Sequence, residues 1–265
     1  MPSGFSELEP WIRAAVFVSV TAVLFLAQRR WPRREQRPWR EATSNVFLFV
    51  TNTALMRVVS ATSLLGASVF AEVHGVGLLN VVALPAAVAF VLAVVVLDFG
   101  LYVQHRLFHW VSWLWRFHAV HHSDLRFDFT TGIRFHPVEM VVSLLFKMAF
   151  VVLLGAAPLA VVVFEVLLST GSLFSHSNVR LPLAADRQLR RAIVTPDMHR
   201  IHHSTLPNEH NLNFGFLISW WDRWLGSYAS EPEAGHQAMT IGLDVYREPS
   251  EQSYAGLLGQ PFKPS

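Results

Sequence analysis

Histidine is the residue type in this chain with the clearest capacity for chemistry. Eight of its thirteen histidines fall into three short clusters with regular spacing. On a helix, residues three or four apart lie on one face, so each cluster can direct two or three imidazoles toward one point. Neutral imidazole is a good ligand for iron, zinc, copper and nickel. The clusters are His105 and His109; His118, His121 and His122; and His199, His202 and His203.

The number of histidines predicts more than one metal ion. Eight convergent imidazoles exceed the ligand set of a single tetrahedral zinc, and they suit a pair of metals. The chain has no cysteine, which excludes disulfides, zinc fingers and cysteine-ligated iron–sulfur clusters. His136, just before Pro137, and His176, in the run Ser175-His176-Ser177, are further candidate ligands.

The composition predicts a membrane protein. Hydrophobic residues make up 52% of the 265 residues and charged residues only 15%, with a mean hydropathy of +0.35. Soluble domains carry about 25% charged residues. The net charge of +2 is small, and the basic residues concentrate beside apolar segments, so no nucleic-acid partner is needed to explain it.

Five apolar stretches have the length of a membrane span, which is about 17–25 residues. We therefore expect an all-α, integral-membrane helical bundle of four or five spans, in which the last two form a helical hairpin. Basic residues follow the first stretch instead of preceding it, which favours a span over a cleaved signal peptide. The stretches are Trp11 to Ala27, Asn45 to Phe70, Val76 to Val103, Val138 to Leu154 and Leu159 to Phe174.

The arginines predict the orientation of these spans. Six arginines lie between Arg29 and Arg40, and the positive-inside rule places this loop in the cytoplasm. Counting spans from there brings all three clusters and His176 to the same side. The polar region after Phe174 should then form a cytoplasmic helical cap that carries the histidines. Trp220, Trp221 and Trp224 suggest an amphipathic segment at the membrane interface.

Acidic residues inside apolar spans are costly and indicate functional sites. Asp98 shares one helical stripe with Tyr102, His105 and His109, at spacings of four, three and four. We expect Asp98 to accept a proton from the second ring nitrogen of a ligand; the alternative is a structural hydrogen bond to a neighbouring helix. Glu165, eleven residues before His176, is a weaker candidate of the same kind.

Two other histidines are expected to lie away from the metals. His236 is predicted to be a solvated surface residue, and His74 to lie in an outer loop on the wrong side of the membrane. The tail from about Ser230 is predicted to be loop with some turns.

The runs HRLFH, LWRFHAVHHS, RFHP, SHSN, TPDMHRIHHS and NFGFLISWWDRWLGS together resemble the fatty acid hydroxylase superfamily, also called the sterol desaturase family. The resemblance spans roughly residues 95 to 228, with the motifs in the family's order. It divides the chain into N-terminal transmembrane helices (1–94), a fatty acid hydroxylase-like di-iron domain (95–228) and a C-terminal cytoplasmic tail (229–265).

This resemblance implies an integral-membrane non-haem di-iron enzyme that uses O2 to hydroxylate or desaturate a lipid. It implies two iron ions per chain, held by the eight clustered histidines at the positions of the family's histidine boxes. The chain departs from the family at His210, where relatives often have an acid, so no ligand role is carried onto His210. Phe214 stands where relatives often have tyrosine.

The chain has no cysteine and no GxGxxG fingerprint, so we expect electrons to come from a separate protein. Three alternatives are a membrane metal transporter, a bis-histidine cytochrome and a non-catalytic relative. The scarcity of charged residues along the spans argues against a transporter. The clustering of the histidines at one end argues against a cytochrome, and the intact histidine boxes argue against a non-catalytic relative. A sterol, fatty acyl, carotenoid or ether lipid remains possible as substrate, and hydroxylation is not separated from desaturation.

Overall fold

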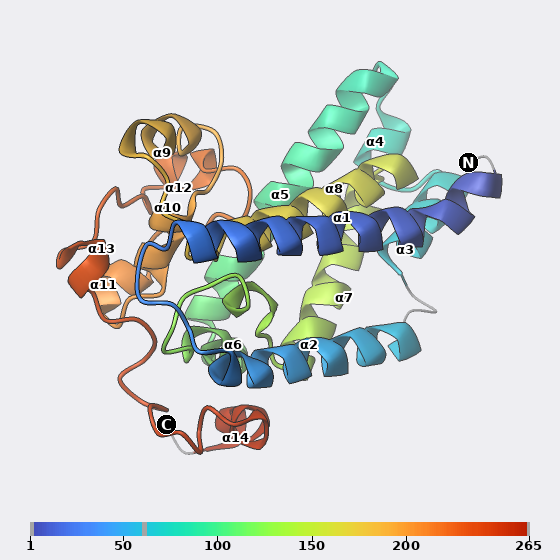
Figure 1. The fold of residues 1–265 in the computed structure, drawn as a ribbon. Helices are drawn as coiled ribbons and strands as arrows, with labels where there is room; N and C mark the ends of the chain where they lie inside the picture. Colours follow the sequence, from blue (N-terminus) through green and yellow to red (C-terminus); the bar gives the residue numbers. More distant parts are fainter. Residues whose placement is uncertain (1–2, 60–62, 264–265) are drawn as a thin grey trace.

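The fold is helical throughout the part of the chain that is described, residues 3–59 and 63–263 of a computed structural model (Figure 1). Three isolated bridges are the only β-type pairings in these ranges. Five segments are long and apolar enough to cross a membrane, which confirms the predicted all-α class. They are Leu8–Arg30, Trp39–Val81, Ala86–Trp110, Pro137–Leu154 and Pro158–Ser175.

The first span is one long helix, and the second is interrupted. Helix α1 (Ser3–Arg30) covers the first predicted stretch. The stretch predicted from Asn45 to Phe70 divides between α2 (Trp39–Val59) and α3 (Leu64–Val73), and residues 60–62 between them lie outside the described residues.

The predicted start of the third span at Val76 is wrong. Helix α4 (Leu78–Val81) is a separate short turn, and α5 (Ala86–Trp110) begins only after Pro85, whose fixed φ suits the residue before a helix. Gly77 adopts φ +96°, and a Cβ there would lie 2.3 Å from the Gly155 backbone nitrogen. The chain therefore turns here against the tip of the next two helices.

Those two helices are joined by the predicted tight turn, and each of them packs against α3 and α5. Helix α7 (Pro137–Leu154) and helix α8 (Pro158–Ser175) each begin with proline at the first position, where its missing N–H is no loss. Gly155 ends α7 in the left-handed conformation at φ +68°. Apolar side chains of α3, α5, α7 and α8 pack together in the main core, among them Ala67, Ala93, Ala160, Val151 and Phe164.

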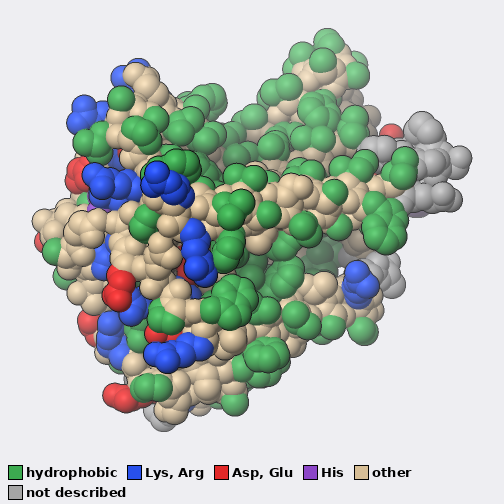
Figure 2. Space-filling view, viewed as in Figure 1, with side chains coloured by type: hydrophobic (Ala, Val, Ile, Leu, Met, Phe, Trp, Pro, Cys, Tyr) green, Lys and Arg blue, Asp and Glu red, His purple; other side chains and the backbone are tan. Residues whose placement is uncertain are grey.

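A polar cap covers one end of the long helices (Figure 1). It contains α6 (Ser112–His122), which follows α5 directly. Figure 2 shows charged side chains gathered over the cap and apolar side chains over the long helices. The other cap elements are η2 (Thr131–Ile133), α9 (Leu183–Leu189), α10 (Pro196–His202), α11 (Pro207–His210), α12 (Trp220–Trp224), α13 (Gly235–Ala238), α14 (Tyr254–Gly259) and η3 (Gln260–Phe262).

The C-terminal segment is more ordered than the predicted loop. Leu257 of α14 is fully buried against Leu48 of α2 and Val120 of α6. Because this contact closes over the back of α6, the segment helps to position the histidines that α6 carries.

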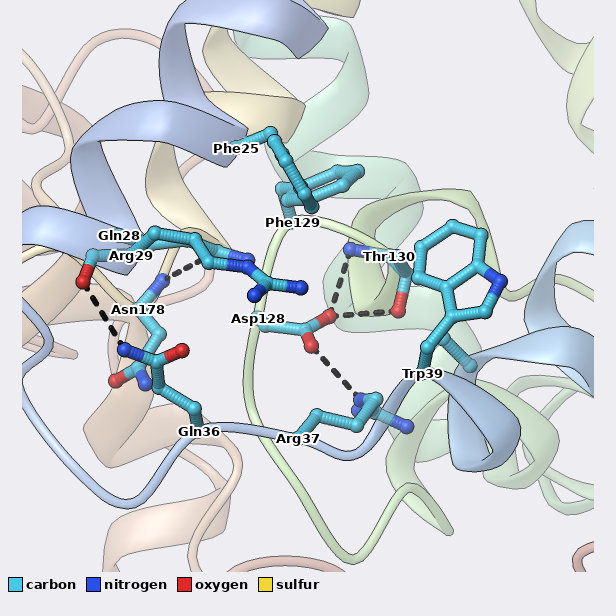
Figure 3. A pocket seen from close by; sticks show the side chains of 11 residues that line it. Phe25, Gln28, Arg29, Gln36, Arg37, Trp39, Asp128, Phe129, Thr130 and Asn178 are labelled. Atoms are coloured by element: carbon cyan, nitrogen blue, oxygen red, sulfur yellow. Dashed lines mark hydrogen bonds and ion pairs between the residues drawn. The ribbon is translucent and has the colours of Figure 1, made fainter.

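Arginines between α1 and α2 tie the linker to the cap. The Arg37 guanidinium donates to Asp124 at 2.7 Å. It also donates to Asp128 at 2.8 Å, and Asp128 accepts from Thr130 (Figure 3). Burial alone lowers the pKa of Arg37, but the two carboxylates outweigh it and raise that pKa. Arg33 bonds Asp197 at 3.0 Å. The linker and the histidine-bearing cap therefore lie at the same end of the bundle, as the counting of spans predicts.

Candidate metal centre

Nine histidines converge in two adjacent groups. The candidate ligand atoms in each group lie within 4.8 Å of one another. All nine are buried except His109, which is half-buried. The first group is His105, His109, His118, His122 and His202, and the second is His121, His176, His199 and His203.

The helical period explains how the histidines of one cluster are shared between the two groups. In α6, His118 and His122 are four residues apart and join the first group, whereas His121 faces the second. In α10 the assignment is reversed, because His199 and His203 join the second group and His202 the first. The expectation that each HxxHH box points at one site is thus wrong in detail: each box contributes an i, i+4 pair to one group and its remaining histidine to the other.

Acceptors behind the rings fix the protonation of several imidazoles. The Nδ1 of His105 lies 2.7 Å from the Phe214 carbonyl oxygen, and that of His202 lies 2.8 Å from the Leu212 carbonyl oxygen. His176 Nδ1 lies 2.8 Å from the Ser172 carbonyl oxygen. Because a carbonyl only accepts, Nδ1 carries the proton in each case and Nε2 presents a lone pair.

Those lone pairs face one another across short distances. The Nε2 atoms of His202 and His105 are 3.0 Å apart. Those of His176 and His121 are 3.1 Å apart, and the Nδ1 of His121 lies 3.3 Å from the Arg134 carbonyl oxygen. Two lone pairs cannot form a hydrogen bond, so neutral rings in this arrangement repel unless a cation lies among them. The residues present therefore fit a metal ion in each group.

Unsatisfied ring nitrogens support the same fit. Both nitrogens of His109, His122 and His203 lack hydrogen-bond partners within the described ranges. Buried polar atoms are almost always paired, so such a set needs an explanation, and a metal ion supplies one. Burial lowers the pKa of His122 and His203 well below the ordinary value, and neighbouring imidazoles lower it further. These rings are neutral at physiological pH, as metal ligands must be.

His136 departs from the sequence-based expectation. It lies in neither group. Its Nδ1 accepts from the Val138 backbone N–H at 3.1 Å and caps α7, while Nε2 lies 3.3 Å from the Leu258 carbonyl oxygen. We correct the candidate set by removing it, since both nitrogens are engaged. His176, by contrast, belongs to the second group.

Asp98 does not contact the histidines. Its Oδ2 accepts from Trp221 Nε1 at 2.7 Å and from the Ile218 backbone N–H at 3.2 Å. Asp98 lies seven residues before His105, which is about 10 Å along a helix. The same face of α5 therefore contacts Trp221 and Ile218 at Asp98 and the other histidines at His105. The expected bond to a ligand is therefore wrong, and the structural alternative holds.

Three more residues complete the comparison with the sequence. His236 is buried, with Nε2 3.7 Å from Asp197, so the prediction of a solvated residue is wrong. His74 is the exposed C-cap of α3 and lies in neither group, and its position on the outer side of the membrane stays a prediction. His210 packs on His109 and His122, with ring centroids 4.8 Å and 4.6 Å away, but lies outside both groups.

Sequence analysis missed Glu139 and Asp222. Glu139 Oε1 lies 2.6 Å from His118 Nδ1. Asp222 accepts from the backbone N–H groups of Phe214 and Gly215 at 2.8 and 2.9 Å. The argument that selected Asp98 and Glu165, an acid in an apolar span, applies equally to Glu139 in the first turn of α7. Asp222 gives no such signal.

A large cavity adjoins the first group. Its volume is about 950 Å³, and His105, His118 and Glu139 line one end. Residues of α1 and α2, such as Phe17, Phe49 and Met56, form its outer walls. Figure 2 shows the surface hollowed between these two helices. The cavity is thus lined mainly by apolar side chains from segments of membrane-spanning length.

The fold and the site define a class of integral-membrane protein that buries paired imidazole clusters at one end of a helical bundle. The chain belongs to the fatty acid hydroxylase family, whose model matches residues 90–227, and it is a membrane oxidoreductase. This confirms the resemblance stated from the motifs. No solved structure matches the chain significantly.

Three relatives illustrate the range of the family. Ornithine lipid hydroxylase OlsE of Rhizobium tropici is 29% identical over 93% of this chain and 74% of its own length. Alkylglycerol monooxygenase of Danio rerio is 29% identical over 58% of this chain and 34% of its own. Human cholesterol 25-hydroxylase is 32% identical over 49% of this chain and 47% of its own. This chain therefore spans less than half the length of the latter two.

Proposed function

We propose that this protein is an O2-dependent lipid hydroxylase whose nine histidines hold two iron ions. The observation that carries the proposal is the position of the first imidazole group, which forms one end of a cavity of about 950 Å³ with apolar walls. Relatives named as hydroxylases and monooxygenases favour hydroxylation over desaturation.

The reaction balances only with an external reductant. One oxygen atom enters the C–H bond and the other leaves as water, which requires two electrons and two protons besides O2. Iron supplies redox chemistry and open coordination positions when bound. The chain has no cysteine or dinucleotide fingerprint, so a separate protein delivers the electrons.

The residues around the site have distinct tasks in this proposal. The neutral imidazoles add no charge, so the metal pair stays strongly cationic, and Glu139 behind His118 offsets part of that charge. The apolar wall, including Phe108 and Phe216, excludes water and holds the hydrocarbon beside His105 and His118.

A membrane lipid is the proposed substrate. It enters sideways between α1 and α2, whose outward faces carry exposed apolar side chains such as Val18, Leu26, Phe47 and Val50. The names of the relatives, which include an ornithine lipid, an alkylglycerol and cholesterol, are consistent with this class.

The proposed location of the centre is the cytoplasmic side. The support is the arginine-rich linker at the same end of the bundle. Because the chain has no cysteine, a single introduced thiol at the exposed Gln188 reports sidedness directly. Gln188→Cys should react with an impermeant maleimide in inside-out vesicles and not in intact cells. The reverse pattern would place the centre outside.

Metal analysis and lipid analysis together test the function. The purified protein should contain two metal ions per chain, chiefly iron, and comparative lipidomics of a deletion strain should show loss of a hydroxylated lipid. His121→Ala and His202→Ala remove one ligand from each group and should abolish product while leaving membrane insertion intact. His74→Ala, at an exposed site, is the matched control. Near-normal product from either ligand variant, or one metal ion in a fully active preparation, would contradict the proposal.

A further inference from the structure

A cluster of charged side chains lines the cavity far from the histidines. Glu9 and Arg13 come from α1, Lys147 from α7 and Glu165 from α8. The Arg13 Nη1 donates to Glu165 Oε2 at 2.5 Å, and Arg13 also forms an ion pair with Glu9. We call these four residues the distal cluster.

The distal cluster lies well away from the metal centre. Lys147 is eight residues from Glu139, which bonds His118, and Glu165 is eleven residues from His176. At 1.5 Å of rise per residue, these spacings give about 12 and 16 Å. The side chains between the two ends are largely apolar, among them Phe17, Met140, Leu168 and Phe216. The cavity thus has two polar ends and an apolar middle.

Lys147 is the member of the cluster that its neighbours do not satisfy. Within residues 3–59 and 63–263, its ammonium group makes no hydrogen bond and no ion pair within 4.0 Å. An ammonium carries three donors, and leaving them without acceptors inside an apolar span is costly. Ionisable residues at such positions mark substrate sites by default.

We propose that the distal cluster binds the oxygen-bearing polar end of the lipid, with Lys147 as the main donor. The hydrocarbon then runs along the apolar middle, and the carbon beside His105 and His118 lies about 12–16 Å from that polar end. The opposite orientation would press an apolar chain end against four charged side chains. This inference rests on the proposed function in one respect, that the cavity holds the lipid.

A purely structural role for the cluster makes a different prediction. The Arg13–Glu165 pair joins α1 to α8 and could serve as a staple between these helices. Such an interhelical ion pair does not involve Lys147, which pairs with neither carboxylate at ion-pair distance among the described residues. Lys147→Met keeps the approximate length of the side chain and removes its charge and its donors while leaving the Arg13–Glu165 pair in place, so it separates the two roles.

Photo-crosslinking tests the orientation without turnover. The full-length, metal-loaded protein in phosphatidylcholine nanodiscs is exposed, without reductant, to hexadecanol carrying a diazirine either at carbon 2 or at the terminal carbon. The carbon-2 probe should label segments around Arg13 and Lys147, and the terminal probe segments around His105 and Phe216. The reverse pattern, or the same pattern for both probes, would overturn the proposal.

Variants complete the test. Lys147→Met should lower labelling by hexadecanol about tenfold, to the level of a hexadecane diazirine of the same length, and should leave hexadecane labelling unchanged. Lys263→Met, in the surface pair with Glu251, should change neither. Unchanged hexadecanol preference in Lys147→Met would overturn the assignment. Because labelling requires no activity, failure of the hydroxylase assay with an intact labelling pattern would contradict the proposed function alone.

Discussion

Glu139 bonds a ring nitrogen of one of the nine histidines, and within the described ranges it is the only carboxylate that does so. The other acceptors behind the rings are backbone carbonyls. A carboxylate raises the basicity of the imidazole and brings negative charge toward a cationic centre. Glu139 therefore has the role that the sequence suggested for Asp98.

Glu139→Gln should reduce metal affinity or activity by about ten- to a hundredfold, the range for residues that support a metal ligand. The amide can still accept from His118, but the charge is lost. Iron content and product formation measured on the same preparation check this. Glu251→Gln, on the surface, is the control, and wild-type iron content together with wild-type activity in Glu139→Gln would refute the role.

His236 gives the protein a predictable sensitivity to acid. Burial lowers the pKa of His236 to about 4, although Asp197 opposes that effect. In the unfolded chain a histidine has a pKa of about 6.5, so between pH 6.5 and pH 4 the unfolded state binds the additional proton. Because the unfolded state is favoured by that proton, His236 lowers the free energy of unfolding as the pH falls from 6.5 to 4.

His236→Gln should remove this contribution. The drop in Tm between pH 7.5 and pH 5 should be smaller in the variant than in the wild type by a few degrees, as measured by differential scanning fluorimetry. His74→Gln, at an exposed position, should show the wild-type drop. An equal drop in all three proteins would argue against titration of His236.

At the residue scale, spacing predicted most of the site because imidazoles three or four apart on a helix must share a face. Eight clustered histidines and His176 fall into the two groups. The roles of His136 and Asp98 depended on contacts with Leu258, Trp221 and Ile218, which are distant in the sequence. Local pattern carries no information about such contacts.

At the scale of elements, the segment from Leu212 to Ser227 holds the first metal group from outside. Its carbonyls at Leu212 and Phe214 orient His202 and His105. Asp222 in turn holds the backbone of this segment through Phe214, Gly215 and Ser227 Oγ. Asp98 bonds it further along, at Ile218 and Trp221. The two aspartates thus act on the ligands only through this segment.

Asp222→Asn should lower iron content more than Asp98→Asn does. Asp222 accepts from the N–H groups of Phe214 and Gly215 and from Ser227 Oγ, and an asparagine offers only one oxygen to these three donors. The backbone donors that lose their acceptor adjoin the Phe214 carbonyl, which orients His105. Asp98 receives both of its bonds on a single oxygen, which asparagine can reproduce. Metal analysis of the two variants side by side checks the order, and a larger loss in Asp98→Asn would contradict this account.

Helices were predictable where apolar runs are long and begin at proline, as in α7 and α8. The prediction failed between Phe70 and Ala86, where α3, α4 and a turn at Gly77 replace a continuous span. Hydropathy is high across the whole region. It does not distinguish a helix that crosses the membrane from a segment that folds back onto the turn between α7 and α8. That distinction is made by packing of Gly77 against Gly155.

At the scale of the whole molecule, the metal groups join parts of the chain that are far apart. Their ligands come from α5, α6, the end of α8 and α10. Removal of the metals leaves facing lone pairs at 3.0–3.1 Å, so the cap should loosen from the helices. A ligand present at a hundred times its Kd stabilises the folded state by about 2.7 kcal/mol.

Chelation should therefore lower the Tm of the wild-type protein by several degrees, and iron should restore it. Tryptophan fluorescence during heating is a suitable measurement, because the chain has nine tryptophans. His121→Ala should show a smaller fall on chelation, since one group is already impaired. No change in Tm on complete metal removal would contradict a role of the metals in holding cap and helices together.

The hollow between α1 and α2, which the stacked rings of Phe17 and Phe49 bridge at a centroid distance of 5.2 Å, has a consequence for kinetics. Both helices are fixed at the cap end through Arg33 and Arg37, and both present apolar faces outward. Under the proposed function, substrate and product exchange with the surrounding leaflet and do not dissolve in water. The quantity that saturates the enzyme is accordingly the mole fraction of the lipid in the bilayer. Diluting a fixed amount of proteoliposomes in buffer should leave the turnover rate unchanged, whereas diluting the substrate with inert phospholipid should lower it.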